Sequence, residues 1–395
     1  GQLGQGNYSA TTGVVTVTGI SDATKIVTGA QFACALSSSN NTYCWGNNSA
    51  KQSSNSAVNQ PTRVPTAFIG VVGLSAGENF LCAMATDASI SCAGDNSKGQ
   101  SAYLDVSAKP LSPGKMASLK LVSAGANTTC AISQTNQLNC WGQIEPKLTT
   151  DTTYIDVAVG NSSACAIESD GSVWCWGANG SGQLGNNSTK PSDSPVKVEG
   201  IASSTVTHIA AGFRHFCAST QDGLVYCWGD NSRGQLGNFG NDSHMAIPVV
   251  GVGTASNVTV GDYHSCALVD TDKVMCWGDN SKKQIQTPAS TKESPMYLGV
   301  SKVTKVAAGG VNTCLLTSDK KVTCIGDNSE LQAPVTISGS FADLAVGNKT
   351  VCLIKDQTNQ VSCLGSNTSL KLGRDGANSP TPVDISGLTA KAVSS

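Results

Sequence analysis

The stretch Cys165-Ala-Ile-Glu-Ser-Asp-Gly-Ser-Val-Trp-Cys175-Trp-Gly-Ala-Asn-Gly-Ser-Gly-Gln-Leu-Gly185 decides the fold of this chain. It contains a cysteine, a polar turn, a β-rich segment, a second cysteine, Trp-Gly and an Asn-Gly corner. The pattern recurs eight times, with successive first cysteines 35 to 52 residues apart. Self-similarity at this period, with short strands bounded by Gly and Pro, is typical of a propeller or a solenoid.

Composition points to an all-β globular protein. The 395 residues are 39% apolar and include 42 glycines, which suits short strands joined by tight turns. Only 13% are charged and the net charge is -2, so no global field attracts nucleic acid or anionic lipid. We therefore expect no nucleic-acid partner. We also expect no membrane-spanning segment, because no window of the sequence contains enough consecutive apolar residues to cross a bilayer. Since Gly1 lies within a repeat, we interpret residues 1–395 as one propeller domain that is part of a longer chain or assembly.

The sixteen cysteines fall into eight pairs that are close in sequence: Cys34 and Cys44, Cys82 and Cys92, Cys130 and Cys140, Cys165 and Cys175, Cys217 and Cys227, Cys266 and Cys276, Cys314 and Cys324, Cys352 and Cys363. In seven pairs the spacing suits two antiparallel strands joined by a three-residue loop. Ser169-Asp-Gly171 has the chemistry of a type I turn followed by a left-handed glycine. This register places Cys165 opposite Cys175, with Cβ atoms about 4.5 to 5.5 Å apart.

Three hypotheses account for these cysteines. Eight disulfides within hairpins would indicate an oxidising compartment. Buried thiols could instead act as small apolar side chains, and two thiolates per hairpin could form half of a zinc site. We favour the disulfides, because an array of facing cysteines with none left over is hard to explain by packing, and only four histidines are present to complete zinc sites.

Each unit predicts four strands. One is a Pro-Val-x-Val-x-Gly segment, as in Pro195–Gly200. The next is a strand of small residues ending in Gly, as in His208–Gly212, which we place near a crowded central axis. The cysteine hairpin supplies the other two. A Trp follows the second cysteine in five units, and we expect these residues to fill the space between neighbouring blades: Trp45, Trp141, Trp176, Trp228 and Trp277.

The run from Gly212 to Gly237, Gly-Phe-Arg-His-Phe-Cys217 through Asp222-Gly223 and Cys227-Trp-Gly229 to Gly234-Gln-Leu-Gly237, resembles the repeat of the regulator of chromosome condensation family. The resemblance covers most of the chain and implies a β-propeller, usually of seven blades. Family members serve guanine-nucleotide exchange, chromatin docking, ubiquitin-ligase accessory roles and, in secreted bacterial relatives, protein binding. The resemblance implies the fold and leaves the function open.

Two features depart from the family pattern. There are eight hairpins where seven are usual, and the eight full units are flanked by two partial ones, at Gly1–Gly4 and Ala390–Ser395. We therefore expect a ring of seven or eight blades. An eight-bladed ring with an overlapping strand pair is the simplest arrangement if the ring closes within this chain.

Candidate binding residues lie where the repeat fails. In unit three the corner is replaced by Gln143–Thr153, and unit five carries an insertion at Asn238–Ala246 with Phe239, His244 and Met245. Gln60–Phe68 is a further stretch that we expect to be irregular. Trp174 is the one Trp outside the repeat rule, on the strand face opposite Cys175, and we expect it to be exposed.

No motif predicts catalysis, a cofactor or a metal. Gly180–Gly185 matches a dinucleotide fingerprint formally, but lacks the required following helix. The repeated Asp-Asn-Ser corners lack the spaced acidic ligands of a calcium loop and are typical of capped turns. His215 and His264 share one repeat position and are interpreted as structural, while His244 in its loop has no nameable catalytic partner.

The sequence favours a non-enzymatic extracellular or cell-surface propeller. Its partner would be a protein or a glycan, or other copies of itself in an extracellular structure. The alternative is an intracellular exchange-factor-like or chromatin-docking propeller. A third hypothesis, an enzyme, is supported only by unrelated propellers that share the fold class.

Overall fold

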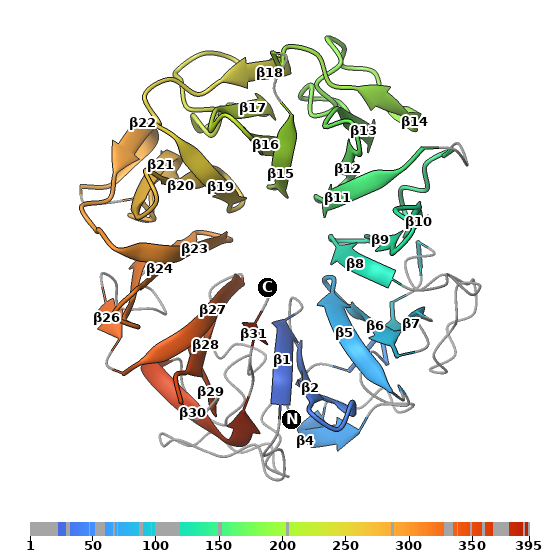
Figure 1. Cartoon of the computed structure of the whole chain (residues 1–395), viewed down its shortest axis with the longest axis vertical. Helices are drawn as coiled ribbons and strands as arrows, with labels where there is room; N and C mark the ends of the chain where they lie inside the picture. The colour runs from blue at the N-terminus through green and yellow to red at the C-terminus, as the bar shows by residue number, and fades with distance from the viewer. Residues whose placement is uncertain are drawn as a thin grey trace.

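The computed structural model describes residues 23–28, 32–46, 48–51, 60–65, 68, 70–86, 90–95, 97–98, 119–148, 152–202, 205–285, 288–327, 335–337, 339–347, 350–357, 360–365, 379–389 and 392–393. These residues form eight β-sheets, which Figure 1 shows arranged as blades around a central axis. Within these ranges no helix is long and apolar enough to cross a membrane. The predicted all-β propeller is confirmed.

The first four blades contain the following strands. Blade 1 has β1 (Ala23–Thr28), β2 (Phe32–Ser37), β3 (Thr42–Gly46) and β4 (Gln60–Pro65). Blade 2 has β5 (Val71–Ala76), β6 (Phe80–Ala85) and β7 (Ile90–Gly94), and blade 3 has β8 (Leu119–Ala124), β9 (Thr128–Ser133) and β10 (Leu138–Gly142). Blade 4 has β11 (Tyr154–Val159), β12 (Ser163–Glu168), β13 (Val173–Gly177) and β14 (Ser192–Lys197).

Blades 5 to 8 each contain four described strands. Blade 5 has β15 (Val206–Ala211), β16 (His215–Thr220), β17 (Val225–Gly229) and β18 (Ser243–Pro248). Blade 6 has β19 (Ala255–Val260), β20 (His264–Val269), β21 (Lys273–Asn280) and β22 (Ser290–Tyr297). Blade 7 has β23 (Val303–Gly309), β24 (Asn312–Thr317), β25 (Val322–Gly326) and β26 (Val335–Ile337). Blade 8 has β27 (Phe341–Gly347), β28 (Thr350–Lys355), β29 (Gln360–Gly365) and β30 (Ser379–Thr389).

Each blade is an antiparallel sheet ordered from the axis outward (Figure 1). The first strand is the small-residue strand, and the next two are the cysteine hairpin. Every side chain of β9 and β16 is buried, whereas the outer strands β14 and β18 are largely exposed. The core therefore lies on the hairpins, between neighbouring blades, and the outer strand faces solvent.

The sheet grouping differs from the predicted order of strands in one respect. The Pro-Val strand is the outermost strand of the sheet that contains the preceding hairpin, as β14 follows β13. An outer strand pairs on one side only, so a proline there removes no second ladder bond. The Val14–Gly19 copy lies outside the described residues.

The predicted hairpin register is confirmed. Cys165 lies directly opposite Cys175 and Ile167 opposite Val173, and Gly171 has φ +85°, the left-handed value that the turn requires. Seven disulfides join opposed cysteines of β2–β3, β6–β7, β9–β10, β12–β13, β16–β17, β20–β21 and β24–β25. The backbones of Cys352 and Cys363 are register partners, and their side chains lie outside the described set.

Small residues at the axis are explained by contact between blades. A Cβ built on Gly212 would lie 2.8 Å from the carbonyl oxygen of Gly261, and one on Gly261 would lie 2.8 Å from that of Gly310. No side chain fits between chains that approach so closely. The same contact with the next blade recurs at Gly77, Gly125 and Gly160.

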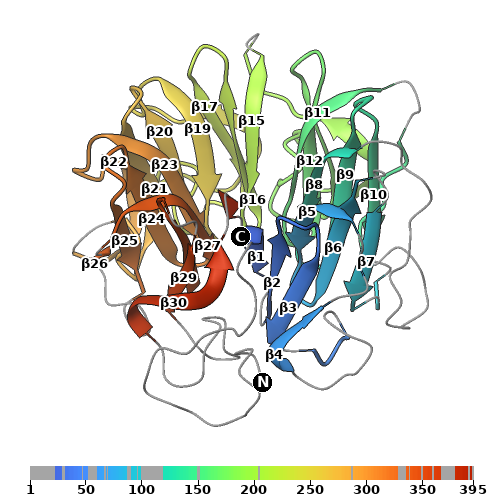
Figure 2. The same ribbon diagram turned by 60° about the horizontal axis from the view of Figure 1, so that its bottom comes forward.

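Strand β31 (Ala392–Val393) pairs in parallel with β1 and also contacts β27. It therefore joins blade 8 to blade 1 at the inner edge of the ring (Figures 1 and 2). This is the overlapping strand pair that was expected for closure with eight blades, since β31 repeats the sequence type of an inner strand.

Two expectations about irregular stretches are wrong. Residues 60–65 form the outer strand β4, in which Val64 pairs with Cys44 and Pro65 with Tyr43, with one register shift between Cys44 and Gly46; residues 66–67 lie outside the described residues. His244 and Met245 lie on β18 and not in a loop, so the insertion in blade 5 is limited to residues 238–242. In both places the prolines and polar residues suggested a loop, but a solvent-facing outer strand accepts them.

Candidate functional site

The strands of each blade run between two faces of the ring (Figure 2). We call one of them the upper face. It carries the turns that follow the inner strands, such as Gly212–Arg214, and the corners that follow each Trp-Gly. The hairpin turns, such as Gln221–Leu224, lie at the other end of the same strands and form the lower face.

The corners of the upper face are rigid because their polar side chains bond the backbone. Asn231 is buried, accepts a hydrogen bond from Leu236 N (3.0 Å) and donates to the oxygens of Asn238 and Gly240. Asp230 Oδ1 accepts a bond from Ser232 N at 2.9 Å. The same carboxylate-to-serine bond recurs at Asp95 and Asp279. This geometry supports the turn-capping interpretation of the Asp-Asn-Ser corners.

A cavity of about 310 Å³ opens where the inner strands converge on the upper face. We call it the channel mouth. Its wall is mostly glycine and alanine from the ends of β5, β8, β11, β15, β19 and β23. Larger side chains enter from the turns, and they are Glu78, Asn161, Phe213 and Asp262. Burial raises the pKa of the Asp262 carboxyl.

A second cavity, of about 240 Å³, lies between blades 4 and 5 beside the mouth. It is lined by Asn161, Ser162, Ser181, Gln183, Phe213 and Arg214, with Ala178 and Gly180. Phe213 is 36% exposed, the Arg214 guanidinium carbon lies 5.7 Å from its ring centroid, and the Tyr263 ring lies 5.8 Å away. The Phe213 ring therefore contacts both an arginine and a second aromatic residue.

The third upper-face cavity contains one of the residues predicted from sequence. It is lined by His244 of β18, Lys292 of β22 and the blade 5 corner, including Asn231 and Asp242. Asp242 Oδ1 accepts a bond from Asn231 N, and Lys292 Nζ donates to the Asn231 carbonyl oxygen. The cavity therefore combines a lysine, a histidine and a carboxylate already engaged in holding its corner.

The four candidate binding residues do not form one site. Phe239 is 65% exposed on the insertion, and Met245 is 36% exposed beside His244 on β18. Trp174 on β13 of blade 4 was expected to be exposed but is half-buried, and its Nε1 donates to Ser172 Oγ at 3.0 Å. Trp174 lines none of the three cavities.

Sequence reasoning missed Phe213, Arg214 and Asp262. All three occupy the variable positions between the repeated glycine and the residue two before the cysteine. The available signal was the aromatic residue Phe213 directly after that glycine, where the other units carry alanine, asparagine, glycine or an acidic residue.

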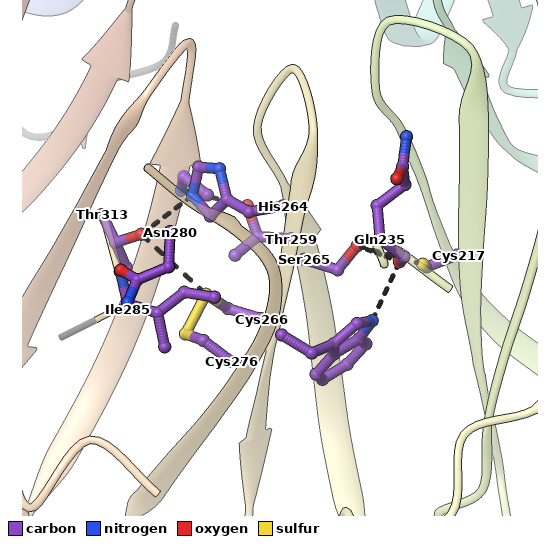
Figure 3. The surroundings of a disulfide bond; sticks show 12 residues. Cys217, Gln235, Thr259, His264, Ser265, Cys266, Cys276, Asn280, Ile285 and Thr313 are labelled. Carbon is purple, nitrogen blue, oxygen red and sulfur yellow. Dashed lines mark hydrogen bonds between the residues drawn. A yellow bond between two sulfur atoms is a disulfide. The ribbon is translucent and has the colours of Figure 1, made fainter. Parts of the chain in front are cut away.

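The two histidines of this turn are structural. His264 Nε2 lies 2.9 Å from Thr313 Oγ1 of the next blade (Figure 3). His215 Nε2 lies 3.0 Å from Ser265 Oγ of the next blade, so each histidine bonds its neighbouring blade. Both rings are fully buried, and desolvation lowers the pKa of His215 to about 3 and that of His264 to about 4. Both are therefore neutral at physiological pH.

Tryptophans join the blades in the same region. Trp277 Nε1 donates to the Gln235 carbonyl oxygen of the preceding blade at 2.9 Å, and Ser265 Oγ donates to the same oxygen (Figure 3). Trp228 Nε1 donates to the Gln183 carbonyl oxygen at 3.0 Å. Trp176 is equally buried, but its Nε1 has no hydrogen-bond partner among the described residues.

The unpaired Trp176 faces the blade that lacks a corner. In blade 3 the segment after Trp141-Gly142 forms no fourth strand over residues 143–148, and Lys147 N donates instead to Asp193 O of blade 4. Ile144 is buried against the neighbouring core. The predicted shortening of unit three is confirmed in these residues. They contain no carbonyl that accepts from Trp176 Nε1 as the Gln183 carbonyl accepts from Trp228 Nε1.

Within the described ranges, no group of three His, Cys, Asp or Glu side chains could hold a metal ion. Among the described residues, His208 Nδ1 lies 3.8 Å from an Asp156 carboxylate oxygen, and Lys305 forms an ion pair with Asp343 (2.5 Å); both contacts join neighbouring inner strands. The arrangement can position a ligand on the upper face by shape, hydrogen bonding and charge.

The fold defines a repeat-built β-propeller whose upper face carries hydrogen-bonded corners and cavities. The family profile described as the Regulator of chromosome condensation (RCC1) repeat matches residues 170–219 and 222–268. A second profile of the same description matches residues 23–52, 120–143, 154–183, 206–235, 255–284 and 303–332. Together they match more than half of the chain, which therefore belongs to the RCC1 repeat family.

Similar proteins share the repeat or the fold. "Protein RCC2 homolog" of Danio rerio is 41% identical over 61 residues, 15% of this chain and 12% of that protein's length. The chain thus matches only a small part of this curated relative. Yeast RCC1 (Prp20) bound to Kap60 has a TM-score of 0.63 at 16% identity, covering 86% of this chain and 83% of that one. The ectodomain of the Physcomitrella patens receptor kinase CR4 has a TM-score of 0.50 at 20% identity, covering 75% and 74%. These two structures support the fold alone.

Proposed function

We propose that this chain is a non-enzymatic binding propeller that works at the cell surface or outside the cell. Its ligand is a protein or a glycan, or other copies of the chain in an extracellular structure. Residues 1–395 act as one propeller domain, and the upper face of blades 4 to 6 carries the contact surface.

The disulfides are the observation that carries the extracellular setting. Seven buried disulfides occupy the same position in successive blades. Disulfides form and persist in oxidising compartments and are rare in the cytosol. Each closes a loop of ten residues and contributes about 2 to 3 kcal/mol, chiefly by restricting the unfolded chain. The ring is therefore suited to conditions outside the cell.

The binding role is supported by where the large exposed side chains lie. Loops on a rigid scaffold are the usual position of binding residues. Phe213, Phe239 and Met245 are exposed at or beside the upper-face cavities. The CR4 structure provides an example of this fold in a receptor ectodomain.

The alternative is an intracellular role. Solved structures of Prp20 concern its binding to Kap60, Gsp1p and histones. An exchange-factor-like activity would be detected as accelerated nucleotide release from a small GTPase, and we expect none.

A cross-linking experiment on intact cells that naturally produce the protein tests the proposal. A membrane-impermeant amine-reactive reagent should link a partner through Lys282 and Lys283, which are exposed at the blade 6 corner of the upper face. Lys320 and Lys321 in the blade 7 hairpin turn serve as lower-face controls and should give no partner links. If the reagent labels the protein only after lysis, the extracellular setting is contradicted. If partner links form only through Lys320 and Lys321, the assignment of the contact surface to the upper face is contradicted.

A further inference from the structure

Two of the upper-face cavities are adjacent. Asn161 and Phe213 line both the channel mouth and the cavity between blades 4 and 5. We treat the two neighbouring cavities as one candidate binding surface that extends from the axis outward, and we call it the radial groove.

The radial groove has opposite charge at its two ends. Asp262 and Glu78 line its inner end, and the Asp262 carboxylate makes no ion pair or hydrogen bond within the described part of the chain. Arg214 lies at the outer end, is exposed, and likewise has no carboxylate partner among described residues. Charges arranged in this way select a ligand with the complementary order of charges.

The middle of the groove suits a peptide main chain. Phe213 offers an exposed apolar surface, held in place by Arg214 and Tyr263. Around it lie hydroxyl and amide side chains, namely Ser162, Ser181 and Asn161. The glycines and alanines of the inner wall have small side chains that leave the groove open there, so the groove presents hydroxyl and amide groups beside an apolar seat.

We propose that the radial groove binds an extended peptide segment of a partner protein. A basic residue of the segment lies over the mouth at Asp262 and Glu78, an apolar residue packs on Phe213, and an acidic residue pairs with Arg214. The inference rests on the binding role proposed above and specifies the ligand as a peptide with basic, apolar and acidic residues in that order. A neutral glycan would use Phe213 and the hydroxyls without depending on either charge.

The test uses a set of fluorescently labelled heptapeptides. Each contains one Lys, one Leu and one Glu, in every order and spacing, with Ser and Ala elsewhere. Anisotropy with the full chain should select peptides in which Leu lies between Lys and Glu. Phe213→Ala, Asp262→Asn and Arg214→Gln should each weaken the best peptide at least tenfold, and Arg214→Glu should recover affinity for the peptide with Glu replaced by Lys.

Two lower-face variants are matched controls. Leu224 is 43% exposed and the Asp319 side chain is 52% exposed, and both lie in hairpin turns. Leu224→Ala and Asp319→Asn should leave peptide affinity unchanged, and circular dichroism checks that every variant is folded. Absence of binding by the whole set, binding without charge preference, or equal loss in the controls would overturn the proposal. If cross-linking in cells still identifies an upper-face partner, the binding role stands and only the groove assignment fails.

Discussion

Replacing Trp228 with Phe should destabilise the ring more than the same change at Trp176. Both indoles are fully buried, and both follow the second cysteine of their hairpin. Trp228 Nε1 donates to the Gln183 carbonyl oxygen of the preceding blade, whereas Trp176 Nε1 has no partner within the described residues. The two substitutions remove the same atoms, so their difference isolates the hydrogen bond between blades.

The expected difference follows from what each variant leaves behind. Trp228→Phe leaves the buried Gln183 carbonyl without its partner, which costs about 1 to 3 kcal/mol in addition to the lost packing. Trp176→Phe removes a buried N–H group that was already unsatisfied, so only the packing loss remains. The free energy of unfolding should therefore fall by about 1 to 3 kcal/mol more for Trp228→Phe.

Urea unfolding followed by circular dichroism, with the disulfides intact, measures this difference. The two variants should share one m-value, so that the shift in midpoint reports stability. Trp277→Phe should cost less than Trp228→Phe, because Ser265 Oγ still donates to the Gln235 carbonyl oxygen after the indole is removed. An equal or greater loss for Trp176→Phe would refute the reasoning.

Other measurements test separate parts of the structure. Burial lowers the pKa of His215 to about 3 and that of His264 to about 4, so below pH 6.5 the unfolded chain binds more protons than the folded one. The free energy of unfolding should therefore fall between pH 6.5 and 4, and at pH 5 it should be lower than at pH 8 by about 2 kcal/mol per histidine. Replacing both with Asn should flatten this dependence in urea titrations, and an unchanged slope would contradict it. Gly212→Ala places a Cβ 2.5 Å from His215 Nδ1 and should cost about 1 to 3 kcal/mol by overpacking, seen as a lowered melting temperature. Replacing Cys165 and Cys175 together by Ser should cost about 2 to 3 kcal/mol, and an unaltered melting temperature would show that the bond contributes nothing.

The hairpins could be predicted from sequence because their determinants are local. The spacing of Cys165 and Cys175, with the left-handed glycine between them, allows one register, which the structure contains. The small inner strands were also predictable, since repeated glycines mark where blades meet.

The remaining features depend on contacts between blades. Whether a Trp finds a carbonyl partner depends on the corner of the preceding blade, some 45 residues away for Trp228. The outer strands were misread because Pro61 and Pro65 in β4, and the polar residues before Met245 in β18, resemble loop sequence. Phe213 and Asp262 were missed because each occupies a variable turn position, and only the closed ring brings them to one cavity.

The proposed extracellular role depends most directly on the oxidation state of the cysteines in the living cell. Alkylation of thiols at the moment of cell lysis, followed by intact-mass measurement of the protein from its natural source, tests this. We predict that none of the sixteen cysteines takes up the reagent until a reductant is added. Sixteen alkylated cysteines without reductant would contradict a disulfide-stabilised propeller that works outside the cell.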